Sequence, residues 1–136
     1  MLNMNTETFL CCDTPLSEAQ TILFGAPFDS TTSYRPGTRF GSSAIRRESF
    51  GIESYSPYQD REDAFVLDCG DLELCLGDTP FALKQIELRT AEVMDAEKRP
   101  FMLGGEHLVT LGAFRAVHAR YPDVHIIHFD AHADLR

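Results

Sequence analysis

The sequence predicts an α/β fold in which helices cover a mainly parallel sheet. Short apolar runs alternate along the chain with stretches whose apolar residues recur at helical spacing, and this pattern is typical of strands joined by helices. Strands joined in this way run parallel, with right-handed crossovers. The chain has 136 residues, 43% of them hydrophobic, so it can bury a core. We expect residues 1–136 to form one compact domain or part of one.

Four short apolar runs are the predicted strands, and they cover residues 21–25, 65–69, 100–103 and 124–129. Each run is rich in apolar residues and is shorter than a typical helix. The four cysteines form neither a CxxC pair nor a disulfide framework, so we expect free thiols in a reducing compartment. We expect Cys69, in the second run, to be a small buried hydrophobic residue.

Two long helices are predicted between the last three strands. The first covers residues 79–94, with Thr79 as its cap and Pro80 at its first position. The second covers residues 107–120, and Pro122 follows its end. Their inward residues are expected at helical spacing: Leu83, Ile86, Thr90, Val93 and Met94 in the first, and Leu108, Leu111, Phe114 and Val117 in the second.

The segment from residue 29 to residue 63 is predicted to be a long loop region with one short helix at residues 43–48. It is rich in Ser, Tyr, Pro and Gly. Loops of this length inside a compact α/β domain are usually functional, because ordering them costs conformational entropy.

The charge of the chain limits its partners. The formal net charge is -9, which argues against nucleic acid or an anionic membrane, since both attract basic surfaces. The amino-terminal residues show no basic segment followed by a long apolar run, so neither a signal peptide nor a transmembrane helix is indicated. We expect a cytoplasmic protein.

Ligand-type side chains follow two of the predicted strands. Gly104-Gly105-Glu106-His107 follows the third strand, and the Asp-x-His-x-Asp run of residues 130–134 follows the fourth. In an open parallel sheet the carboxyl ends of the strands form the binding crevice. If the run stays extended, Asp130, His132 and Asp134 point to one side, and His107 reaches them if the two strands pair.

A divalent cation would relieve the repulsion between carboxylates held so close together. The alternative is that these are solvated loop residues, since short motifs recur by chance. Carboxylate and imidazole without thiolate suit manganese, iron or zinc, and the share of carboxylate oxygen favours manganese.

Four segments resemble the ureohydrolases of the arginase superfamily, and agmatinases most closely. They are GAPFDSTTSYRPGTRFG at residues 25–41, CGDL at 69–72, GGEH at 104–107 and HFDAHADLR at 128–136. The resemblance extends over nearly the whole chain from about residue 21. GGEH together with DAHAD is highly specific for the superfamily, whereas the first segment carries the choice of agmatinase.

The resemblance implies a three-layer α/β/α fold and two Mn²⁺ ions that activate a hydroxide to attack a guanidinium carbon. By position, His107 and Asp134 would bind one ion, His132 the other, and Asp130 both. Two residues would support these ligands without binding metal themselves, namely Glu106 and His128, although a strand histidine is more often satisfied within the core. Asp29 and the loop after it would line the mouth of the crevice, and Ser42, where relatives often have proline, can cap the short helix.

Members of this superfamily are about twice as long, and their second half supplies further metal ligands and the groups that bind guanidinium and shuttle protons. We therefore expect residues 1–136 to be the amino-terminal part of a single ureohydrolase domain, with an exposed sheet edge and an incomplete substrate site. The complete enzyme would be a homo-oligomer acting on a small cationic guanidino compound.

Three functions stay open at this point. The leading one is hydrolysis of agmatine to putrescine and urea by a metal-activated hydroxide, with this chain inactive or incomplete alone. The second is hydrolysis of another guanidino or formimino compound by a related ureohydrolase of the arginase, guanidinobutyrase or formiminoglutamase type. The third is a noncatalytic metal-binding module.

Overall fold

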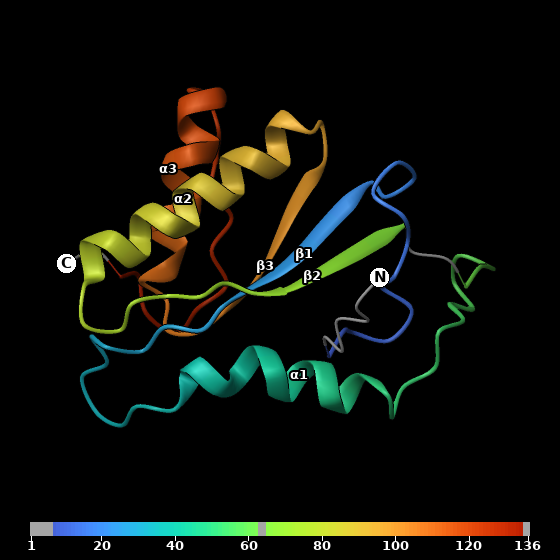
Figure 1. Cartoon of the computed structure of the whole chain (residues 1–136), viewed down its shortest axis with the longest axis horizontal. Coiled ribbons are helices and arrows are strands. Elements are labelled where there is room, and N and C mark those ends of the chain that lie inside the picture. Colours follow the sequence, from blue (N-terminus) through green and yellow to red (C-terminus); the bar gives the residue numbers. More distant parts are fainter. Residues whose placement is uncertain (1–6, 63–64, 135–136) are drawn as a thin grey trace, which may run out of the picture.

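A computed structural model describes residues 7–62 and 65–134 of the chain. A parallel sheet of three strands lies between helices on its two faces (Figure 1). The strands are β1 (Thr21–Ala26), β2 (Val66–Asp71) and β3 (Arg99–Gly104), in the order β2-β1-β3. These bounds confirm the predicted strands at residues 21–25, 65–69 and 100–103 to within two residues. The fold class predicted from the sequence is therefore confirmed.

The helices are α1 (Gly41–Ser49), α2 (Thr79–Asp95) and α3 (Val109–Arg120), with a short 3-10 helix, η1 (Thr38–Phe40), before α1. All three predicted helices are present. The predicted caps are wrong: Asp78, not Thr79, caps α2 by accepting a hydrogen bond from the backbone N–H of Phe81. Ser42 does not cap α1, because its hydroxyl donates instead to Asp71, over 2.8 Å.

The hydrophobic core lies between β1 and the two long helices. Phe24 and Ile22 of β1 pack with Val93 of α2, while Ala26 and Phe28 pack with Ile86 of α2 and with α3. Every residue of β1 after Thr21 is buried. The central strand is thus covered on both faces, as in other parallel sheets.

The inward face of α3 differs from the prediction. Val109, Gly112 and Ala116 are buried, whereas Leu111 is exposed. The reason is a close approach of α3 to α2 at Gly112, where a Cβ would lie 2.7 Å from the carbonyl oxygen of Leu83. Small residues of α3 face α2 at this contact, so larger residues of α3 such as Leu111 point away from it.

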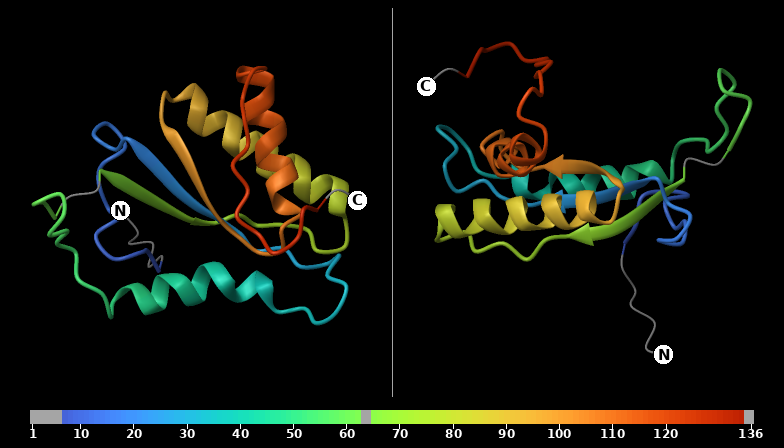
Figure 2. Two further views of the ribbon diagram at one scale, coloured as in Figure 1. Left: turned by 180° about the vertical axis from the view of Figure 1, so that it is seen from behind. Right: turned by 90° about the horizontal axis from the view of Figure 1, so that it is seen from above.

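The predicted strand at residues 124–129 is wrong. In the described part of the chain, no strand follows α3, and this apolar run is largely exposed: Phe129 is 95% exposed. The right view of Figure 2 shows this segment, in red, extending away from the sheet. A strand needs a hydrogen-bonded neighbour, and β3 pairs only with β1 in the described sheet.

Cys69 is exposed, which also corrects the sequence prediction. The pairing of β1 with β2 shifts there: Leu23 lies opposite Asp68, but Gly25 lies opposite Asp71. The two intervening residues, Cys69 and Gly70, therefore form a bulge against one residue of β1. The extra residue interrupts the regular alternation of side chains, so the place of Cys69 within an apolar run does not make it buried.

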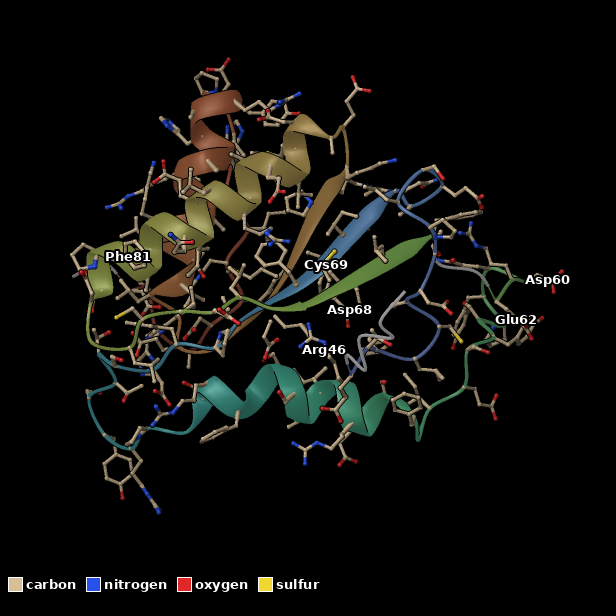
Figure 3. All side chains as sticks on the ribbon, viewed as in Figure 1. Arg46, Asp60, Glu62, Asp68, Cys69 and Phe81 are labelled. Atoms are coloured by element: carbon tan, nitrogen blue, oxygen red, sulfur yellow. The ribbon has the colours of Figure 1, made fainter. Side chains whose placement is uncertain are left out.

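The bulge places Asp68 and Asp71 on the same face of the sheet, where both contact Arg46 of α1. Figure 3 shows Asp68 and Arg46 facing each other between β2 and α1. The Arg46 guanidinium donates to Asp68 through Nε over 2.7 Å and Nη2 over 2.9 Å, and through Nη1 to Asp71. Gly25 leaves space for this arrangement, because a Cβ there would clash with the Asp71 carboxylate. Burial alone would lower the pKa of Arg46, but the two carboxylates outweigh it and raise the pKa.

A segment before β1, at residues 12–14, covers the outer edge of β2. Cys12 accepts a hydrogen bond from the backbone N–H of Asp68, and Thr14 donates to the carbonyl of Val66. Asp13 and Leu67 form an antiparallel bridge between them. In the described residues, therefore, the edge at β2 is covered, while the edge at β3 is not. No helix in the described ranges has the length and apolar run needed to cross a membrane.

Arg46→Ala should lower the free energy of unfolding by about 3–5 kcal/mol, because it leaves the buried Asp68 without its cation. Arg47→Ala is the matched control: this side chain is the next one along α1 and is 67% exposed, so its loss should cost less than about 0.5 kcal/mol. Urea denaturation at neutral pH measures both changes. Equal losses in the two variants would contradict a structural role for the buried pair.

Cys12 should react with iodoacetamide far more slowly than Cys11 in the folded chain at mildly alkaline pH. The pKa of Cys12 is raised to about 11, mainly by burial and next by the Asp68 carboxylate. Its thiol therefore stays protonated and unreactive. Cys11 is exposed. Peptide mass spectrometry after brief labelling checks this, with urea-unfolded protein as the control. Equal labelling of the two cysteines would mean that the segment does not cover the β2 edge.

Candidate metal centre

The carboxyl ends of β1 and β3 lie side by side, because the two strands pair in parallel up to Ala26 and Gly104. The turn after β3 packs directly on the segment after β1. Gly105 approaches Phe28 so closely that a Cβ would lie 2.0 Å from the Phe28 carbonyl oxygen. The backbone N–H of Glu106 donates to that same oxygen over 2.8 Å. This turn brings His107 to the edge of the sheet, two residues before α3 begins.

Three of the four predicted ligands lie together at this edge. His107, Asp130 and Asp134 each offer a ligand atom, and these atoms lie within 4.8 Å of one another. His107 Nδ1 and Asp134 Oδ2 are 2.8 Å apart. One imidazole and two carboxylates are a suitable donor set for a divalent cation such as Mn²⁺.

His132 lies outside this group. Its Nδ1 is 3.6 Å from Asp130 Oδ1, and its side chain is 82% exposed. The extended backbone expected for residues 130–134 is absent: Asp130 accepts a hydrogen bond from the backbone N–H of His132, and Asp134 has a φ of 49°. A turn, not strand alternation, therefore brings Asp130 and Asp134 together. The ligand roles themselves stay predictions.

The surroundings of Asp130 favour its charged carboxylate form. The backbone N–H of His132 is the main cause that lowers the pKa of its carboxyl group, and nearby histidines, His107 among them, act in the same direction. The carboxylate form is therefore favoured, and this is the form that binds metal.

His128 is exposed and is not a satisfied core residue. Its Nε2 lies 3.2 Å from the His132 carbonyl oxygen and 4.0 Å from Asp130 Oδ2. It contacts the loop that carries Asp130 and His132, and its role in supporting the ligands stays a prediction.

The other two predicted site residues are buried and face the loop after β1. Glu106 is 6% exposed and accepts hydrogen bonds from the backbone N–H of Thr31, over 3.0 Å, and from its hydroxyl. Asp29 is 3% exposed and accepts from the backbone N–H of Gly37 over 2.6 Å. Asp29 itself is not among the residues that line the cavity, which corrects the expectation for it, whereas the loop after it does line the cavity. The Asp29 carboxylate instead accepts a hydrogen bond within that loop and so helps to order it.

An open cavity of about 880 Å³ lies beside His107 and Asp134. Thr31 and Ser33 contribute hydroxyls to its lining, and Leu108 and Leu111 contribute apolar side chains. Sequence reasoning did not single out the two hydroxyl residues. The signal available was their place in a Ser- and Thr-rich stretch directly after a strand end.

A sequence profile of the Arginase family matches residues 19–136. The agmatinase of Bacillus cereus is 45% identical over 132 residues, which are 96% of this chain and 46% of that protein. A crystal structure from Clostridium difficile is 51% identical, with a TM-score of 0.83 over 90% of this chain and 45% of that one. The agmatine ureohydrolase of Thermoplasma volcanium is 33% identical, with a TM-score of 0.76 over 83% of this chain and 39% of that one.

The fold and these matches define an arginase-type α/β protein. The chain belongs to the arginase family. It spans about half the length of the curated relatives that it matches.

His107→Ala should weaken Mn²⁺ binding at least about tenfold. Removing a residue that only hydrogen-bonds to a metal ligand already costs about tenfold, and removing a ligand should cost no less. His125→Ala is the control, because His125 is exposed and lies outside the ligand group. Isothermal titration with Mn²⁺ measures both affinities. If both variants bound Mn²⁺ as tightly as the unchanged chain, His107 would not be a ligand.

Proposed function

We propose that this chain supplies the amino-terminal metal ligands and part of the substrate cavity of a manganese-dependent ureohydrolase, with agmatine as the substrate and putrescine and urea as products. The observation that carries the proposal is the group of His107, Asp130 and Asp134 beside an open cavity, in a member of the arginase family. The 45% identity to an agmatinase supports the choice of substrate.

The proposed reaction requires an activated nucleophile. A guanidinium carbon is a poor electrophile, because resonance spreads the positive charge over three nitrogens. Bound Mn²⁺ would supply a nucleophile at neutral pH and would offset the charge of the carboxylates. Of the described residues, His107, Asp130 and Asp134 would hold one ion. The family resemblance assigns His132 to a second ion, which Asp130 would share.

The cavity offers chemistry that suits a cationic guanidine on an alkyl chain. Leu108 and Leu111 would lie along the methylene groups, and the Thr31 and Ser33 hydroxyls would accept hydrogen bonds from N–H groups. The net charge of -9 would attract a cation. We also propose a cytoplasmic location, because the free cysteines suit a reducing compartment. From the resemblance, we propose that the complete enzyme is a homo-oligomer.

Co-expression with the carboxyl-terminal half of the Bacillus cereus agmatinase tests this function, because this chain spans only the first part of such proteins. In samples where the two polypeptides co-purify, urea release should require Mn²⁺ and should be faster with agmatine than with arginine or guanidinobutyrate. His107→Ala should abolish release, while His125→Ala should leave it unchanged.

Two outcomes would contradict the proposal. Co-purified samples that bind Mn²⁺ but release no urea from any of the three guanidines would reject the hydrolase function and leave a metal-binding module. Faster turnover of arginine or guanidinobutyrate would reject agmatine as the substrate. The chain assayed alone shows whether it has independent activity.

A further inference from the structure

Two buried carboxylates hold the loop after β1 from opposite ends. Asp29 follows β1 and binds the far part of the loop through the backbone N–H of Gly37. Glu106 follows β3 and binds the near part through Thr31. Both acids are less than 10% exposed. A buried carboxylate is costly unless its oxygens are hydrogen-bonded, so these contacts have a structural purpose.

Glu106 differs from Asp29 because it also belongs to the turn that carries His107. One oxygen of its carboxylate accepts a hydrogen bond from the Thr31 hydroxyl, and the other accepts one from the Thr31 backbone N–H. Its own backbone N–H is fixed on the Phe28 carbonyl oxygen, and Gly105 packs on the same residue. The His107 turn and residues 28–31 are therefore joined at the backbone and at the side chain.

The loop held in this way forms one wall of the cavity. Thr31 and Ser33 line it directly, as do His107 and Asp134. A shift of Thr31 would thus change the cavity beside the metal-binding group, and a shift of the His107 turn would be passed to Thr31.

We propose that Glu106 is a positioning residue that couples the His107 turn to the cavity wall through the Thr31 hydroxyl. The proposal rests on the proposed function for the identity of the cation at His107. Its consequence is reciprocal: binding Mn²⁺ orders the His107 turn and thereby the loop, and an ordered loop favours Mn²⁺ binding. Residues 30–39 should exchange their amide hydrogens more slowly when Mn²⁺ is present.

Hydrogen exchange in matched Thr31 variants tests this coupling. Thr31→Val keeps the shape of the side chain but removes the hydroxyl, and Thr31→Ser keeps the hydroxyl. Without metal, Thr31→Val should speed exchange at residues 30–39 about tenfold, the expected effect of losing a hydrogen bond to a charged acceptor. Thr31→Ser should exchange like the unchanged chain.

Glu106→Gln gives a second test, because the amide nitrogen that replaces one carboxylate oxygen does not accept a hydrogen bond. It should also speed exchange in the loop. Glu18→Gln is its control, since Glu18 is exposed, and should have no effect. Unchanged exchange in β1 (Thr21–Ala26) separates local release from global unfolding.

Adding Mn²⁺ should slow loop exchange in the unchanged chain and in Thr31→Ser, but not in Thr31→Val. A purely structural contact would instead let Mn²⁺ slow all three equally, and this result would overturn the proposal. Metal-free exchange that is the same in Thr31→Val, Glu106→Gln and the unchanged chain would also overturn it. If titration shows that the unchanged chain binds no Mn²⁺, the proposed function fails, and the metal-free comparison still decides whether Glu106 holds the loop.

Discussion

The parallel direction of the three strands is the constraint on which the rest of the structure depends. Because β1 and β3 end side by side, the loop after one strand packs on the turn after the other. Asp29 lies far from Glu106 and His107 in the sequence, and this pairing brings them to the same edge of the sheet. The sheet orders the backbone, and the side chains that follow the strands carry the chemistry.

The opposite face of the sheet depends on the bulge in β2. An extra residue turns Asp68 and Asp71 toward the same helix, where Arg46 satisfies both. Asp68 also accepts the backbone N–H of Phe9, so the cation, the strand and the amino-terminal segment form one network. Since a buried carboxylate without a cation is costly, this network fixes α1 on the sheet. Through η1 and the preceding loop, α1 is continuous with the wall of the cavity.

The pattern of apolar residues in the sequence was sufficient to place several elements. It predicts the positions of β1, β2, β3 and α2, and for β1 and α2 it also predicts the burial found. It fails for residues 124–129, because an apolar run does not specify a hydrogen-bonded neighbour. It fails for Cys69 and Leu111 because a bulge and a close helix contact at Gly112 depend on partners far away in sequence.

The candidate site shows the same division. The motifs point to four ligands, of which the structure brings together His107, Asp130 and Asp134 but not His132. The contact between Thr31 and Glu106 joins residues 75 positions apart, and no local pattern predicts it. We expect one cation to bind between His107 and the two carboxylates. Anomalous diffraction at the manganese edge, on crystals of the chain grown with Mn²⁺, would locate it. A peak should lie in contact with His107 Nδ1 and with oxygens of Asp130 and Asp134, whereas well-ordered crystals with no peak there, or with a peak bound by other residues, would rule out this site.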